Sequence, residues 1–421
     1  MAGLRRRTVL RTGALAAVAG VAGCSSVART AGFGDFVRIA VSWSATELAA
    51  FRNVLAGRGV DDVDLIPFGD DIGAALGVRT TGRPHLVALP QPGLVAGNLA
   101  NLEPLPAELW YPEYDRIWSQ NLPTTGHYAL PFKLAHKSVV WFRKKIFADR
   151  GLDPPQTWQQ WLALNDAIIA EPSLGAPLAL GGADGWMLAG FLENILLRSF
   201  PESYDALAAP GHDRRLWESG DVRAAFQMLA DMWGRPGVFA GGPRRALVQQ
   251  FPDAVLEVFK YHTAAMVVAP DFAESVIRRF GVPADEVETF TFPPLTTPGG
   301  PLVAAGDLIV LTRPAEQRAV DVIRYLGEPR AALPWIRDTG GFIAANPATD
   351  RSYYSPILAR LSKELTSQQI RFDLADQLGP AGGREGLQRV LQNFLHGLAD
   401  GRSGEESVRT ALAAMVSAEA G

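Results

Sequence analysis

The sequence predicts an α/β protein with two lobes, each a mostly parallel sheet flanked by helices. Short β-branched segments alternate with longer amphipathic segments along almost the whole chain, which is the pattern of sheets covered by helices. The chain has 421 residues, too many for one hydrophobic core and enough for two. Its first three predicted strands are separated by two helices, which favours parallel pairing.

The β-α-β-α-β segment at the start of the folded body supports this prediction. Residues 36–41 are β-branched and alternate in polarity, as in a strand. Thr46 is placed to cap a helix on which Leu48 and Phe51 share one face. Further elements of this segment are expected as strands at 64–68 and 86–89 and as a helix at 72–78.

The rest of the chain continues the alternation. A Pro-rich stretch at 103–112 is typical of a surface connection. Strands are expected at 126–132, 138–142, 264–268 and 308–311. Helices are expected at 158–170, 185–200, 222–233 and 315–326, and the chain from 353 onward has helical periodicity.

The first 23 residues have the composition of an export signal. Arg5, Arg6 and Arg7 precede an uncharged run at 12–23, and Cys24 follows it. Such a run is shorter than the roughly 20 residues that cross a bilayer, so we expect residues 1–23 to be removed. The Arg6-Arg7 pair resembles a twin-arginine signal, and the sequence leaves the twin-arginine and Sec routes both open.

The end of this signal also carries a lipidation motif. Val21-Ala22-Gly23-Cys24 resembles the bacterial lipobox, which implies that Cys24 is lipidated and becomes the N-terminus. Residues 24–34 would then be a tether, and the body would lie outside the cytoplasm, anchored to the membrane. Cys24 is the only cysteine, so no intramolecular disulfide is expected.

Charge and motifs exclude several function classes. Four of the 40 Lys and Arg residues lie in 1–23, so 36 remain against 44 Asp and Glu, a formal charge of -8. An acidic body argues against nucleic-acid binding. The sequence has no phosphate-binding loop, no nucleophile elbow and no His-Glu-x-x-His, and its six histidines lack metal-ligand spacing. We therefore expect no enzyme activity, no metal and no cofactor.

A succession of motifs resembles one family over nearly the whole mature chain. The segments that carry it are Gly126 to Phe132, Val139 to Arg143, Gly151 to Trp161, Thr263 to Val268 and Trp335 to Ala344. In this order they resemble the bacterial extracellular solute-binding proteins of the maltose-binding type, which serve carbohydrate ABC importers. This sequence departs from the family pattern at His85, Arg143 and Ile343, which puts transfer of a relative's ligand in doubt.

The resemblance implies a two-lobed clamp of the periplasmic-binding-protein type that closes on a ligand by a hinge motion. It also implies capture of a carbohydrate or related polyol and delivery to permease subunits, and we expect a monomer. Crossings between the lobes are expected near 124–131 and 293–305, with a third after Gly341. The N-terminal lobe would comprise 35–128 and 295–340, and the C-terminal lobe 129–294 and 341–421.

A sugar packs its flat C–H faces against aromatic rings, and its hydroxyl groups bind carboxylates and amides. The candidate ligand residues are therefore aromatic and polar side chains. Some candidates follow predicted strands and others lie beside a predicted crossing. Trp186 ends a glycine-rich segment, 181–186, that is predicted to form a turn opening a helix. Each has a structural alternative, such as packing for Trp43 or helix capping for Asp70. The candidates are Trp43, Asp70, Phe132, His136, Trp186, Tyr261, Asp307 and Phe342.

Other functions stay open from sequence alone. A secreted glycan hydrolase would need two carboxylates facing each other about 5 to 10 Å apart. An envelope lipoprotein that recruits a protein partner would expose an apolar patch instead of a cleft. A glycerophosphodiester is an alternative cargo, since Lys133 follows a predicted crossing and could meet a phosphate.

Overall fold

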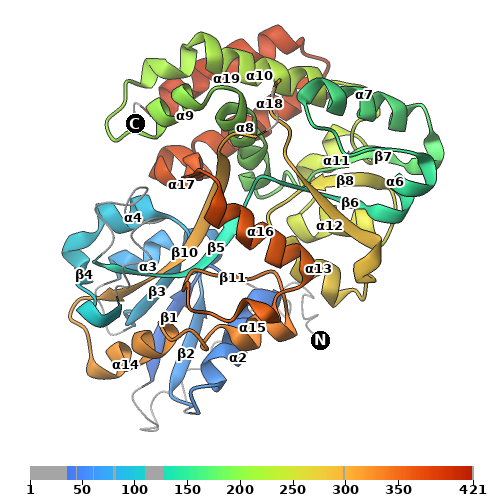
Figure 1. The fold of residues 1–421 in the computed structure, drawn as a ribbon. Coiled ribbons are helices and arrows are strands. Elements are labelled where there is room, and N and C mark those ends of the chain that lie inside the picture. The colour runs from blue at the N-terminus through green and yellow to red at the C-terminus, as the bar shows by residue number, and fades with distance from the viewer. Residues whose placement is uncertain are drawn as a thin grey trace, which may run out of the picture.

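The computed structural model describes residues 36–43, 45–59, 61–78, 82–109, 127–296 and 299–419. Within them the chain forms two lobes, each with its own sheet and its own covering helices (Figure 1). The predicted two-lobed α/β class is confirmed. The predicted signal peptide, Cys24 and the tether lie outside the described residues.

The first lobe is built on an eight-stranded sheet. Six of its strands follow the order β11-β5-β10-β3-β1-β2, and the other two, β4 and β12, each pair with β10. Its strands are β1 Val37–Val41, β2 Val63–Pro67, β3 Leu86–Leu89, β4 Leu102–Glu103, β5 Ala129–His136, β10 Leu302–Thr312, β11 Ile343–Ala344 and β12 Ile370–Phe372. Its helices are α2 Ala45–Ala56, α3 Gly73–Gly77, α4 Pro92–Gly97, α14 Gln317–Leu326 and α15 Leu333–Asp338.

The second lobe has a four-stranded sheet in the order β7-β8-β6-β9. Its strands are β6 Val139–Arg143, β7 Ala176–Ala179, β8 Ala264–Val268 and β9 Val287–Thr291. Its helices are α6 Lys144–Arg150, α7 Trp158–Ile169, α8 Trp186–Ser199, α9 Pro201–Ala208, α10 Gly220–Trp233, α11 Pro243–Val248, α12 Phe251–Phe259, α13 Ala273–Arg279, α18 Leu387–Ala399 and α19 Gly404–Ala418. Trp158, Trp161 and Phe191 pack in its core.

Both sheets are mixed, which differs from the expected mostly parallel pairing. Strand β1 is parallel to β2 and β3, as its β-α-β-α-β segment predicts. Strand β10 is antiparallel to β3 and β5, and β6 is antiparallel to β8 and β9. The antiparallel pairs involve the strands next to the crossings: β5 and β6 at the first, and β9 and β10 at the second. The passage of the chain between the lobes therefore accounts for the mixed strand directions.

Two crossings run side by side. Lys137 and Ser138 connect β5 to β6, and residues 292–301 connect β9 back to β10. The Lys137 N–H donates to the Val303 carbonyl at 2.9 Å, and the Val303 N–H donates to Ser138 Oγ at 2.8 Å. A third crossing follows β12 through α17, Leu374–Gln377. Helix α16, Pro356–Ser367, lies between the lobes (Figure 1).

These crossings correct the predicted lobe boundaries. Residues 129–136 form β5 and belong to the first sheet, because the chain crosses only after this strand. Residues 343–344 and 370–372 also pair within the first sheet, so the third crossing lies about 30 residues later than the position after Gly341.

The residues that depart from the family pattern support the backbone. His85 Nδ1 accepts a hydrogen bond from the Arg38 N–H at 2.9 Å. Arg143 is buried and donates to the carbonyls of Leu174 and Ala264, each at 3.4 Å. Ile343 lies in β11 and pairs with Leu134. All three departures therefore have a structural use.

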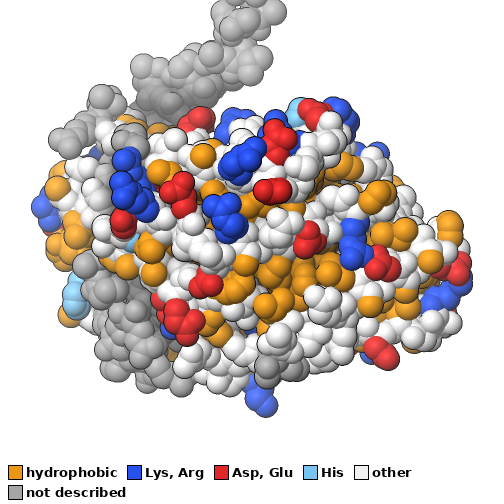
Figure 2. Space-filling view, turned by 90° about the horizontal axis from the view of Figure 1, so that it is seen from above, with side chains coloured by type: hydrophobic (Ala, Val, Ile, Leu, Met, Phe, Trp, Pro, Cys, Tyr) orange, Lys and Arg blue, Asp and Glu red, His pale blue; other side chains and the backbone are white. Residues whose placement is uncertain are grey.

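The face seen from above Figure 1 has mixed charge. Figure 2 shows Lys and Arg side chains interspersed with Asp and Glu, with hydrophobic atoms between them. Nucleic-acid-binding proteins gather their basic residues into a patch or stripe, an arrangement that this face does not have. Among the described residues, no helix has the length and apolar composition needed to cross a bilayer.

Candidate functional site

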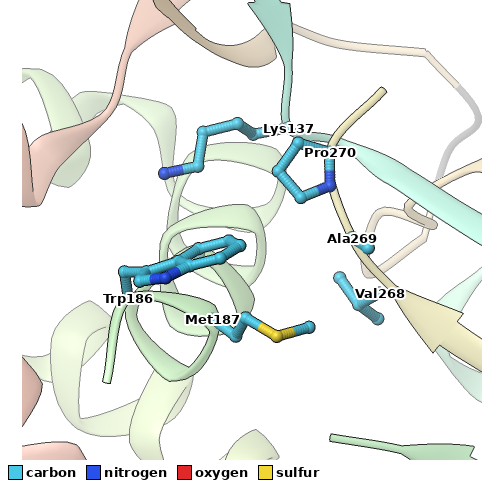
Figure 3. Close-up of a pocket in the computed structure, with 7 residues that line it drawn as sticks. Lys137, Trp186, Met187, Val268, Ala269 and Pro270 are labelled. Atoms are coloured by element: carbon cyan, nitrogen blue, oxygen red, sulfur yellow. The ribbon is translucent and has the colours of Figure 1, made fainter. Parts of the chain in front are cut away.

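A hollow of about 210 Å³ lies where the second lobe meets the first crossing. Its walls come from the crossing itself, the start of α8 and the chain that follows β8. The lining residues are Lys137, Trp186, Met187, Gly190, Val268, Ala269 and Pro270. Figure 3 shows the indole of Trp186 and the side chain of Lys137 on two sides of this space, with Pro270 on a third.

Trp186 is the accessible aromatic ring of the site. Of the tryptophans in the described ranges, it alone is not buried. Its ring packs against Phe251 and Phe272 at centroid distances of 5.3 and 5.9 Å, which fixes its orientation. A partly accessible indole held by neighbouring rings provides an apolar platform for a ligand.

The turn before α8 explains how Trp186 is positioned. Gly185 has φ of 80°, a conformation that favours glycine, and a Cβ there would lie 2.7 Å from Gln388 Cβ. Gln392 Nε2 donates to the carbonyls of Gly182 and Ala183, each at 2.9 Å. Helix α18 therefore holds the predicted glycine turn in place at the start of α8.

Lys137 is the cation of the hollow. Its Nζ pairs with Asp373 at the third crossing and lies 6.0 Å from the centroid of the Trp186 ring. The carbonyl of Lys137 accepts a hydrogen bond from Asn194 Nδ2 of α8 at 3.1 Å. Lys137 thus lines the hollow and connects the first crossing to the third through its ion pair with Asp373.

Three of the aromatic candidates lie in one buried cluster of the first lobe. Trp43 and Phe132 are each 4% exposed, and Phe342 is fully buried. Phe132 packs against Phe342 at 5.2 Å and Trp43 at 6.1 Å, and Trp335 joins the cluster. These rings form core rather than accessible walls in this structure.

A charged group lies next to that cluster. Asp307 Oδ2 accepts a hydrogen bond from Trp43 Nε1 at 3.1 Å. Burial raises the pKa of Asp307 to about 6, although nearby Lys133 opposes the shift. Lys133 Nζ is paired with Glu47 at 2.7 Å. Burial opposes the charge on Lys133, but the carboxylates of Glu47, Asp307 and Asp271 together raise its pKa.

His136 is fully buried at the end of β5. Its Nε2 lies 3.1 Å from Glu364 Oε2 of α16, and burial lowers its pKa although Glu364 opposes that shift. Its backbone N–H donates to Asp271 Oδ1 at 2.6 Å. His136 therefore joins the crossing to α16 and to the loop after β8, and does not line the hollow.

The two remaining candidates lie elsewhere. Tyr261 is 56% exposed and precedes β8, whereas the hollow is formed by residues that end and follow that strand. Asp70 is part of a 3-10 turn at Gly69–Asp71, and its side chain lies outside what the structure describes.

Sequence reasoning did not select Lys137, Met187 or Pro270 as site residues. Lys137 has a signal in the sequence, since it falls between the strands predicted at 126–132 and 138–142, a few residues after the crossing predicted at 124–131. Pro270 follows the predicted strand at 264–268, at the carboxyl end where ligand loops leave a sheet. Among the described ranges, no group of three His, Cys, Asp or Glu residues is arranged to hold a metal ion.

The buried carboxyl of Asp271 gives a prediction for pH. Burial raises its pKa to about 7, against roughly 3.9 in an unfolded chain. The folded state then binds more protons between these values, so this group's contribution to stability falls as pH rises from about 4 to 7. We expect Asp271→Asn, which keeps an oxygen for the His136 N–H, to lose less thermal stability than the parent over that range. If the melting temperatures of the parent and of Asp271→Asn change equally from pH 4 to 8, the raised pKa of Asp271 is contradicted.

Comparison with known proteins gives the family context. The profile of the family described as bacterial extracellular solute-binding protein matches residues 80–332, more than half of the chain. An osmoprotective compounds-binding protein of Synechocystis sp. is 28% identical over 351 residues, covering 79% of this chain and 81% of the relative. An alpha-glucosides-binding periplasmic protein of Rhizobium meliloti is 25% identical over 347 residues, covering 75% and 72%.

Solved structures agree with the fold. A chitin oligosaccharide binding protein superposes with a TM-score of 0.72 at 16% identity, covering 91% of this chain and 99% of the other. A maltose-bound protein of T. maritima superposes with a TM-score of 0.67 at 16% identity, covering 90% and 98%. The architecture is therefore shared over nearly the whole length of these proteins.

Proposed function

The chain belongs to the bacterial extracellular solute-binding protein family, and from that premise we propose that it captures a carbohydrate or related polyol between its lobes for an ABC importer. The observation that carries the cargo class is the accessible ring of Trp186 beside the first crossing. A flat indole with polar groups nearby suits the C–H face and hydroxyl rim of a sugar. The two relatives are named for binding osmoprotective compounds and alpha-glucosides, which supports this class.

The geometry favours a neutral cargo over a phosphodiester. A phosphate would need a cation free to meet it. Lys133 is paired with Glu47, and Lys137 is paired with Asp373. Around these lysines, Asp271, Asp307 and Asp376 add carboxyl groups whose pKa values burial raises to about 7, 6 and 7. An anionic ligand would therefore meet two lysines that are already paired and several buried carboxyl groups.

Capture requires the lobes to move. Sites for small organic ligands usually enclose about 300 to 1000 Å³, and the hollow at Trp186 falls short of that range even when the open solvent at its mouth is included, at about 210 Å³. We therefore infer that the lobes separate about the crossings to admit the solute and close on it afterwards. The closed form would be the one presented to the permease.

The same proposal includes the location of the protein in the cell. Lipidation at Cys24 would hold a monomeric body beside the membrane, outside the cytoplasm, with residues 24–34 as its tether. A solute-binding body in that position can reach permease subunits by diffusion in two dimensions. Mass spectrometry of the exported protein should find the mature N-terminus at Cys24 with attached acyl chains.

A thermal-shift panel tests the function. The body from residue 25 is melted with monosaccharides, disaccharides, amino sugars, polyols and glycerophosphodiesters. A ligand at 100 times its dissociation constant should add about 2.7 kcal/mol of stability. A shift with a sugar or polyol that is recovered unchanged would support the proposal. Stabilisation by a glycerophosphodiester alone would show that the cargo is a phosphodiester and not a sugar or polyol. Turnover of a glycan would show that the protein is a hydrolase.

A further inference from the structure

Helix α13 of the second lobe contacts the first lobe at a place separate from the crossings. Arg278 Nη2 donates to the Arg337 carbonyl at 2.8 Å, just before the end of α15. Glu274 Oε2 accepts a hydrogen bond from the Gly341 N–H at 2.8 Å, and Glu274 is only 6% exposed. Figure 1 shows α13 beside α15 and the chain that leads into β11.

Two glycines make this close approach possible. Gly340 and Gly341 have φ of 73° and 62°. A Cβ at Gly340 would lie 2.5 Å from both Arg278 Nη1 and Glu274 Oε2. A Cβ at Gly341 would lie 2.9 Å from the Cα and carbonyl oxygen of Phe272, which are backbone atoms. Residue 341 can therefore contact α13 in this way only as glycine.

Further contacts join the same two lobes around α13. Arg279 Nη1 donates to Thr46 Oγ1 at the start of α2. Lys133 Nζ of β5 lies 4.8 Å from the centroid of the Phe272 ring. Neither Glu274 nor the residues from 336 to 341 line the hollow at Trp186. This set of contacts thus joins the lobes without lining the hollow, although Phe272 also packs against the Trp186 ring.

We propose that α13 and the segment from Ile336 to Gly341 form a latch that holds the two lobes closed. In this assignment Glu274 and Gly341 are positioning residues, which set how far the equilibrium favours the closed form. Their effect on solute affinity rests on the proposed function, because only a clamp that captures ligand converts closure into affinity. Closure itself can be measured with no solute present.

The test measures the distance between the lobes. The full chain carries Cys24→Ser, and spin labels are attached at Asn53→Cys in α2 and Val248→Cys in α11, both exposed positions. Pulsed electron spin resonance then gives the distribution of label-to-label distances. We expect one short-distance population in the parent. Gly341→Ala should move a large part of it, at least about half, to longer distances, because the added methyl group meets the Phe272 backbone.

Two matched controls separate the latch from general damage. Gly59→Ala also places alanine at positive φ, 76°, but no atom lies within 4 Å of its Cβ, so the parent distribution should persist. Glu274→Ala should lengthen the distance, whereas Glu274→Gln keeps an acceptor oxygen and should not. If Gly341→Ala fails to fold, Glu274→Ala decides the outcome. Parent-like distances in both folded variants would overturn the latch, and a failed solute panel would leave this result unaffected.

Discussion

Trp186→Ala should weaken binding of the carbohydrate or polyol found in the thermal panel by roughly ten- to a hundredfold, which is about 1.4 to 2.7 kcal/mol. Trp186 is the accessible indole at the hollow, so its removal deletes the platform on which the apolar face of a sugar would stack. Titration calorimetry on the folded variant measures this change directly. The loss should appear in the dissociation rate more than in the association rate.

Two further variants make the Trp186 prediction specific. Trp186→Phe keeps a ring at the same position and should lose less affinity than Trp186→Ala. Tyr261→Ala removes an aromatic ring that is 56% exposed at the opposite end of β8 and should bind as the parent does. Equal affinity of Trp186→Ala and the parent would place the solute elsewhere between the lobes.

Periodicity predicted most of the regular elements. The strands expected at 86–89 and 264–268 coincide with β3 and β8, and the helix expected at 158–170 ends one residue later than α7. These segments bury a face or a whole strand, so their hydrophobic pattern is strong. Two strands of the second sheet had no such signal. Strand β7 has only four residues and contains Pro177, and β9 is partly exposed.

The site was harder to predict than the fold. The glycine turn at 181–186 placed Trp186 correctly at the start of a helix, because glycine and helix-start signals are local. Whether an aromatic residue is accessible depends on contacts distant in sequence. Trp43 follows β1 just as a ligand residue would, yet its ring is enclosed by Phe51, Phe132 and Trp335. Sequence alone does not reveal that enclosure.

The lobe boundaries needed the same distant information. The sequence indicated a crossing at 124–131, before β5, whereas the chain crosses after that strand, at Lys137 and Ser138. The crossing expected at 293–305 overlaps the observed connection at 292–301. Strand β5 joins the first sheet because β10 and β11 pair with its two edges. The segment that forms β12 was expected to be helical, because its three residues lie between helices and their partners in β10 are 68 residues earlier in the chain. Pairing between such remote segments leaves little trace in either one alone.

Phe132→Ala should lower the free energy of unfolding by about 3 to 5 kcal/mol, the usual cost of removing a buried phenyl ring. Phe132 is 4% exposed, and its ring lies 5.2 Å from Phe342 and 5.8 Å from Phe51. The deletion would leave a cavity inside the cluster on β5, a strand that is paired along both edges and cannot easily collapse into it. Denaturant unfolding followed by circular dichroism measures the loss.

The control and the ligand result together decide what Phe132 does. Phe280→Ala removes a ring that is 43% exposed and should cost no more than about 1 kcal/mol. If Phe132 serves the core, its alanine variant loses stability, and at a temperature where it stays folded it binds solute within a few-fold of the parent. A stable Phe132→Ala variant without affinity would mean that the ring faces the ligand once the lobes open. In that case the aromatic cluster around Trp43 and Phe342 would be a wall of the open cleft that packs together on closure.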